Sequence, residues 1–98
     1  MKTKSYEEYL LKTLQDPEEA LGYLNAALMD EDRRVFLLAL KHVLKAQRID
    51  ISAFADETNI SRQNVYRIVS ETGNPRWDNL SAILDAMGLQ LRVEAKAK

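Results

Sequence analysis

The chain has 98 residues, of which 46% are hydrophobic, 30% charged and 7% aromatic, a length that suits one small domain with a short extension. It has no cysteine, which excludes disulfides, cysteine-based zinc sites and thiol catalysis, and its single histidine argues against a multi-histidine metal site. No apolar run approaches the roughly 18 residues that span a bilayer, and no signal-peptide stretch follows Met1. We therefore expect a cytoplasmic protein with no membrane partner and no cofactor.

Charge is nearly balanced overall and unevenly distributed along the chain. There are 14 basic and 15 acidic residues, hence a net charge of −1, whereas a domain held to nucleic acid by bulk charge is normally basic. Residues 1–32 nevertheless carry −5, and residues 33–49 carry +5 with no acidic residue. Such segregation permits two surfaces with two different partners.

Helical periodicity predicts three helices before residue 47. The first carries Tyr6, Tyr9, Leu10 and Leu14 on one stripe. A second begins at residue 17, a proline, with the preceding aspartate as its N-cap. The third is predicted from residue 35 to residue 46, after the acidic cluster at 30–32. Its inward residues are expected to be Phe36, Ala39, Leu40, Val43 and Leu44.

Two short helices around a tight turn are predicted next, at residues 51–58 and 62–70. Asn59 stands where the turn needs a positive φ, and Ser61 is placed to cap the second helix. Arginine pairs with guanine, and glutamine or asparagine pairs with adenine. An outward face of these residue types is what a recognition helix presents to the major groove. The outward residues of the second helix are Arg62, Gln63, Asn64, Tyr66 and Arg67.

The remainder is predicted to form a loop, a last helix and one strand. Residues 71–75 are typical of a loop, with Gly73 at a left-handed helix terminus. Asp78 is expected to cap the last helix, which ends at Gly88. Apolar and polar residues alternate from Leu89 to Ala95, which predicts one half-buried strand. Because a lone strand leaves its backbone groups unpaired, we expect a homodimer in which the same strand of a second copy pairs with it. The alternative is that a strand of a partner protein pairs with it.

At these residues the sequence resembles the Xre/Cro-type helix-turn-helix family, over about residues 34–91. Nearly the whole chain also resembles the addiction-module antidote proteins, in the stretches Tyr23–Leu28, Val35–Leu40, Gly73–Arg76 and Gly88–Val93. This resemblance implies a DNA-binding antitoxin that neutralises a small RelE/ParE-type toxin and represses its own operon by binding double-stranded operator DNA. The acidic front of the chain could meet a basic toxin.

The chain departs from the Xre/Cro pattern at three positions. Ile51 stands where many members have a glutamine that contacts a phosphate, and Asn59 replaces the usual glycine of the turn. Val69 stands where a glutamate is common.

The expected fold is therefore all-α: a helix-turn-helix bundle with an N-terminal helical extension (residues 1–32), a DNA-binding domain ending in one C-terminal β-strand (residues 33–95), and a tail (residues 96–98). No glycine-rich phosphate loop or carboxylate constellation indicates an enzyme. The residues assigned to DNA binding are Ser61, Arg62, Gln63, Asn64, Tyr66, Arg67 and Arg76.

Several alternatives stay open at this point. The polar face of residues 62–67 is also compatible with a solvated helix surface, and the basic residues of 33–45 with either phosphate contacts or solvent. Tyr66 could pack or stack, and Trp77 is interpreted as a core anchor. A stand-alone prophage-type repressor without a toxin partner is the alternative function, and a helical adaptor that has lost DNA binding is a third.

Overall fold

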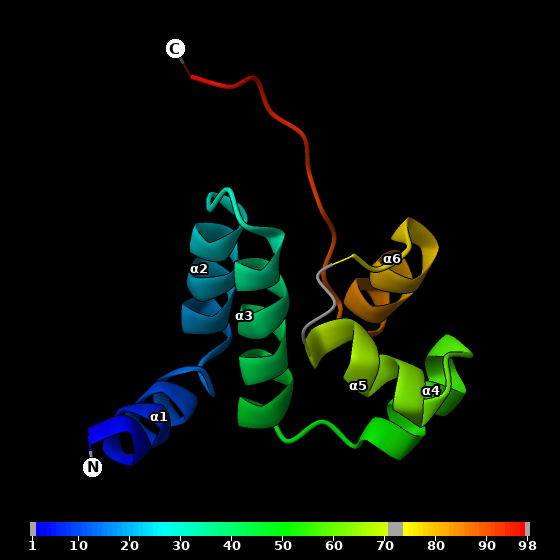
Figure 1. The fold of residues 1–98 in the computed structure, drawn as a ribbon, viewed down its shortest axis with the longest axis horizontal. Coiled ribbons are helices and arrows are strands. Elements are labelled where there is room, and N and C mark those ends of the chain that lie inside the picture. The colour runs from blue at the N-terminus through cyan, green and yellow to red at the C-terminus, as the bar shows by residue number, and fades with distance from the viewer. Residues whose placement is uncertain (1, 71–73, 98) are drawn as a thin grey trace.

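Helices make up the regular structure of residues 2–70 and 74–97, the part of the chain that the computed structural model describes. Every helix expected from the sequence is present, arranged around a long central one (Figure 1). The helices are α1 (Lys2–Thr13), α2 (Pro17–Leu28), α3 (Arg33–Ala46), α4 (Ile51–Thr58), α5 (Arg62–Ser70) and α6 (Trp77–Ala86).

Aspartates fix the starts of three consecutive helices. The side chain of Asp16 accepts a hydrogen bond from the backbone N–H at position 18, and Asp32 and Asp50 do the same for α3 and α4. Each cap satisfies a backbone donor that has no partner within the helix. The expected cap at residue 16 is thereby confirmed. At the other end of α4, Asn59 has a φ of 64°, which confirms the left-handed conformation expected for the turn.

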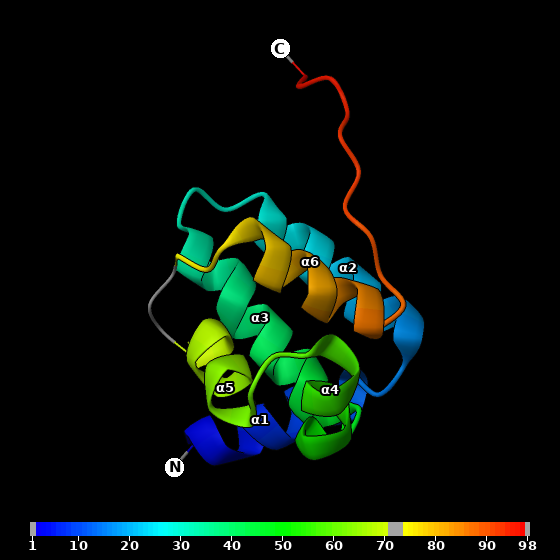
Figure 2. The same ribbon diagram turned by 90° about the vertical axis from the view of Figure 1, so that its right-hand side faces the viewer.

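The central helix α3 lies between α2 on one side and α5 on the other, as Figures 1 and 2 show. All five of its predicted inward residues are buried, and Leu40 has no exposed surface. Leu14, Leu24 and Ala27 of the N-terminal part belong to the same core cluster. The helices before and after residue 32 therefore share one core, and the division into an extension and a DNA-binding domain stays a prediction.

The predicted stripe of α1 is only partly buried. Leu14 is 1% exposed and Leu10 is half-buried, whereas Tyr6 and Tyr9 are 65% and 70% exposed. Burial of the stripe increases toward the end of α1, because α1 contacts α3 and lies at an angle to it. The first turns of α1 therefore lie away from the core (Figure 1).

The start of α6 differs from its prediction. Trp77 is the first residue of α6 and is 66% exposed, so its interpretation as a core anchor is wrong. The buried stripe of α6 instead begins farther along and contains Ile83 and Leu84. Asp78 is not the cap, because the helix starts one residue before it, and Arg76 holds the N-cap position without a side-chain cap bond.

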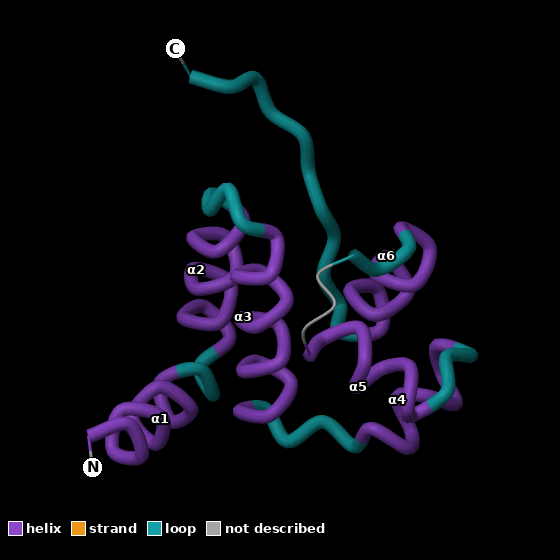
Figure 3. Tube along the Cα trace, viewed as in Figure 1, coloured by secondary structure: helices purple, strands orange, loops and turns teal. Residues whose placement is uncertain are grey.

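The C-terminal β-strand is not formed. Residues 89–97 leave the helices without strand pairing, and no segment of residues 2–70 and 74–97 is a strand (Figure 3). Leu89 still packs against the core, but Val93 is 99% exposed. Alternation of apolar and polar residues predicts an extended backbone, but a strand also needs a neighbour that completes its hydrogen bonds. This chain offers none in the described ranges.

The last helix ends as expected, because Gly88 has a φ of 78°. The expected left-handed terminus at Gly73 lies outside the described residues. None of the helices in those described ranges is long and apolar enough to cross a membrane.

Candidate nucleic-acid interface

The helix α5 is held in place by its inner face and by the turn before it. Val65 has no exposed surface, and Ile68 and Val69 are also buried. Ile60, in the turn between α4 and α5, is 7% exposed and belongs to the core cluster. The hydroxyl of Ser61 accepts a hydrogen bond from the backbone N–H of residue 64 at 3.2 Å, which confirms its expected capping role. The inner face thus fixes which side chains of α5 point outward.

The polar side of α5 is open to solvent. Successive residues of an α-helix are about 100° apart, so Gln63 and Arg67 lie opposite the buried face, with Asn64 on one flank and Tyr66 on the other. All of these side chains are exposed, and Tyr66 is 51% exposed. Six of the seven predicted site residues therefore come from one short helix and Ser61, the residue that caps it.

Arg76 stands apart from this face, at the start of α6. Its guanidinium donates to both carboxylate oxygens of Asp78, from Nε and Nη2, each at 3.2 Å. The hydrogen bond from Arg76 lowers the pKa of the Asp78 carboxyl, and the same bond raises the pKa of Arg76. Both groups are mostly exposed, so the ion pair is weak. A phosphate at Arg76 would compete with this carboxylate.

A groove runs along the Tyr66 flank of α5. It has a volume of about 370 Å³ and lies between the C-terminal half of α3, the start of α4 and α5. Its floor is apolar and its rim is basic. The residues around it are Lys41, Leu44, Lys45, Arg48, Ile49, Ile51, Val65, Tyr66 and Val69.

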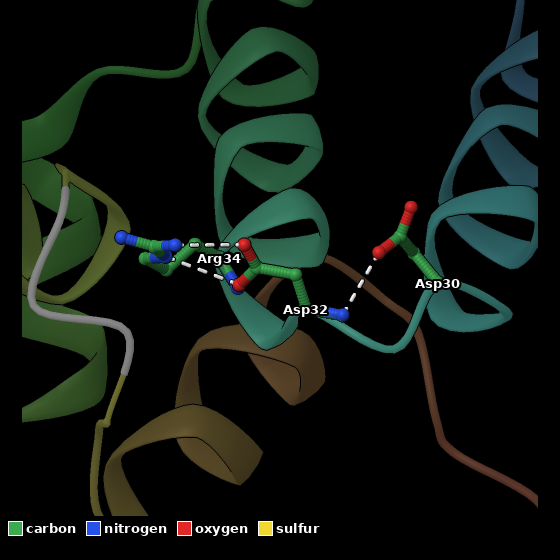
Figure 4. A network of polar contacts seen from close by, with 3 residues as sticks. All are labelled: Asp30, Asp32 and Arg34. Carbon is green, nitrogen blue, oxygen red and sulfur yellow. Dashed lines mark hydrogen bonds and ion pairs between the residues drawn. The ribbon is translucent and has the colours of Figure 1, made fainter.

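The opposite end of α3 carries a different polar cluster (Figure 4). Arg34 forms an ion pair with Asp32 through Nη2 and Oδ2 at 2.9 Å, and Asp30 accepts from the backbone N–H of Asp32 at 2.8 Å. The hydrogen bond from Arg34 lowers the pKa of Asp32. Arg34 therefore belongs to the cap of α3 and lies at the far end of that helix from the groove.

The histidine is part of the packing between α2 and α3. The phenol oxygen of Tyr23 lies 2.8 Å from Nδ1 of His42. Burial lowers the pKa of His42 and raises that of Tyr23. Among the described residues, no group of three histidine, aspartate or glutamate side chains is arranged to hold a metal ion.

These observations define a small all-helical protein in which one short helix exposes a polar face. The family model described as probable addiction module antidote protein matches residues 4–95. The chain is also 32% identical, over 81 residues, to an uncharacterized protein of Haemophilus influenzae, and the alignment covers 83% of this chain and 81% of that relative. No solved structure matches.

The chain belongs to the family of probable addiction module antidote proteins. An antidote of an addiction module is an antitoxin, so membership implies a toxin partner in general. The predicted resemblance to antidote proteins is confirmed at this level.

Proposed function

We propose that this antidote is a cytoplasmic DNA-binding antitoxin of the Xre/Cro helix-turn-helix type. It neutralises a RelE/ParE-type toxin and represses its own operon. In this proposal it acts by binding alone and carries no catalytic centre. The single observation that supports DNA binding best is the outward face of α5, where arginine and amide side chains stand exposed on a helix whose inner face is buried in the core.

The proposed mode of binding places α5 in the major groove. Gln63 and Arg67 lie at the centre of the outward face and would reach base edges, where an amide pairs with adenine and a guanidinium with guanine. Arg62 and Asn64 lie at the first turn, the part of a recognition helix that approaches the bases. Tyr66, on the flank, would contact the sugar-phosphate backbone.

A homodimer would serve this function. One short helix reads few bases, whereas two copies can place their α5 helices in successive major grooves about 34 Å apart. The C-terminal segment does not form a strand in the single chain, so we propose the dimer on the ground of operator geometry alone.

Measurement of DNA affinity for two α5 variants tests the proposal. Arg62→Ala and Gln63→Ala each remove one base contact worth about 1–3 kcal/mol, which is a loss of roughly 5- to 150-fold in affinity. Fluorescence anisotropy on the chain's own promoter and on scrambled DNA should show a larger loss on the promoter. Gln90→Ala is the matched control, since Gln90 is also an exposed glutamine and lies outside α5, after the last helix. Promoter binding by both α5 variants at the wild-type level would contradict the proposal.

The toxin-binding part of the proposal rests on the acidic front of the chain. Glu18 and Glu19 lie in the first turn of α2 and are both exposed, and residues 1–32 carry −5. A toxin directed at RNA would present a basic surface, which the acidic front of this chain would attract. Co-expression with the product of the adjacent gene, followed by co-purification, tests whether the chain binds a toxin. The variant Glu18→Lys/Glu19→Lys should retain less of that partner while its DNA binding persists. If no small basic partner is retained, the stand-alone repressor is the better description.

A further inference from the structure

The five basic residues of positions 33–49 fall into two separate groups in the structure. Arg33 and Arg34 are at the N-terminal end of α3, where Arg34 is paired with Asp32 and Arg33 lines a groove next to Asp30. The other three residues surround the groove beside α5 at the opposite end of the helix. We call this second group the basic rim and define it as Lys41, Lys45 and Arg48.

The basic rim keeps its positive charge largely uncompensated. Among the described residues, none of the side chains that line this groove is acidic. Glu7 of α1 reaches the Nζ of Lys45 at 3.3 Å, but the two side chains are 49% and 61% exposed. Ion pairs with this exposure are worth at most about 1 kcal/mol and are screened by salt, so a stronger anion can displace the carboxylate.

Arg48 is held in an unusual backbone conformation. Its φ is 53°, in the left-handed region that a non-glycine residue seldom occupies. The turn is closed by hydrogen bonds from the N–H of Arg48 to the carbonyl of Lys45 at 3.1 Å and from the N–H of Ile49 to the carbonyl of Leu44 at 3.2 Å. Glycine would adopt this conformation without strain. The presence of an arginine there points to a role for its side chain at the surface.

The basic rim and the polar face of α5 are neighbours. Tyr66 belongs to both, since it lines the groove and lies on the flank of the outward face. A duplex seated on α5 would therefore bring one of its strands past Tyr66 toward the rim. Ammonium groups bind phosphate as point charges, and a guanidinium binds it through two parallel hydrogen bonds.

We propose that Lys41, Lys45 and Arg48 bind backbone phosphates of the same DNA duplex whose bases α5 reads. This inference rests on the proposed DNA-binding function and assigns the strand contacts that fix the orientation of α5. Contacts of this kind position a protein on the duplex and carry no sequence information. They add a salt-dependent and sequence-independent contribution to affinity.

The test compares two variants that remove equal charge from the two ends of α3. Lys41→Ala/Arg48→Ala removes two charges from the basic rim, and Arg33→Ala/Arg34→Ala removes two from the far end. Affinity is measured against salt concentration on the promoter and on scrambled DNA. The slope of log affinity against log salt falls by about 0.9 for each phosphate that the protein no longer neutralises. The rim variant should therefore have a slope smaller by about 1.8 on both DNAs, and the far-end variant should keep the wild-type slope.

A second rim variant guards against misfolding. Lys41→Gln/Lys45→Gln changes two exposed positions of α3, where glutamine is a good helix former, and it should also lower the slope. Equal slopes for the rim variants and the wild type would overturn the inference, and so would an equal decrease in the far-end variant, which would indicate a bulk effect of charge. If the wild-type protein itself binds neither DNA, the proposed DNA-binding function fails. If the wild type binds DNA but the rim variants keep its slope, only the assignment of the basic rim fails.

Discussion

Two residues other than glycine, Arg48 and Asn59, have a left-handed backbone conformation in the described part of the chain. The sequence predicts this conformation for Asn59 but not for Arg48. Asparagine tolerates positive φ better than most residues, and Asn59 falls between two helical patterns, so its conformation was predictable. Arg48 follows a helix that the sequence pattern predicts clearly. Neither arginine nor the residues next to it are typical of a left-handed turn. Its conformation depends on how α3 must end to let the chain enter α4.

Substitutions at position 59 test the strain of the turn. We expect Asn59→Ala to lower the free energy of unfolding by about 1 kcal/mol, because alanine lacks the short polar side chain that lets asparagine tolerate the left-handed region. Asn59→Gly should be at least as stable as the wild type. Urea denaturation measures both, with Asn25→Ala at an exposed position of α2 as the matched control. An Asn59→Ala variant as stable as the glycine variant would contradict the observed geometry.

The pairing of Tyr23 with His42 predicts a pH-dependent stability. Burial lowers the pKa of His42 from its ordinary value of 6.5. Between that value and the lower folded-state pKa, the unfolded chain binds more protons than the folded chain. Stability should therefore be fully present above pH 6.5 and fall as the pH drops through the folded-state pKa. Urea midpoints between pH 8 and pH 5 measure this decline.

His42→Gln is the control for this decline, because it removes the titrating group. Its stability should lack the part of the pH dependence that His42 contributes. An NMR titration that placed the pKa of His42 at or above 6.5 in the folded protein would contradict the prediction.

At the scale of elements, local sequence signals predict the helices well. They fail where the structure of a segment depends on a partner that is distant in the sequence. The bounds 51–58 and 62–70 were obtained from sequence because caps, turns and apolar spacing lie within a few residues of each other. The strand at 89–95 was predicted wrongly, because its alternation is local but its hydrogen-bond partner is not. Trp77 was misplaced for a related reason, since a large apolar side chain marks a core position only when a neighbouring helix covers it.

Removal of the end of the C-terminal segment should leave the fold intact. A chain that stops after Leu91 keeps the residue that lines the groove near α6 and loses Val93, which is 99% exposed. We expect its free energy of unfolding to stay within about 0.5 kcal/mol of the wild type. Leu84→Ala in α6, at a position 4% exposed, should cost about 2–5 kcal/mol and serves as the destabilised reference. A decrease of more than about 1 kcal/mol on truncation would show that residues 92–98 pack in a way the structure does not contain.

At the scale of the whole molecule, the candidate site was only partly predictable. The outward face of α5 follows from one helical pattern, so its residues could be assigned from sequence. The basic rim combines one end of α3 with the flank of α5, and only folding shows that Lys41 and Arg48 belong to one group while Arg34 belongs to another. The separation of Arg76 from α5 likewise depends on where α6 begins.

The shared core predicts one cooperative unfolding unit. Leu24 of α2 is 5% exposed and belongs to the same cluster as Val65 of α5. Leu24→Ala should therefore destabilise the whole chain by about 2–5 kcal/mol. Native-state hydrogen exchange should show equal decreases of protection in α2 and α5. Unchanged protection in α5 would instead support two independent units divided near residue 32.

At Arg48 the left-handed turn sets folding stability against the proposed binding of operator DNA. Arg48→Gly relieves the backbone and is expected to raise the free energy of unfolding by about 1 kcal/mol, while the same change removes a phosphate ligand from the basic rim. Selection for stability alone would favour glycine here, and selection for function would retain arginine. A thermostability screen of this antidote should therefore recover Arg48→Gly, and the recovered protein should hold its promoter less tightly than the parent.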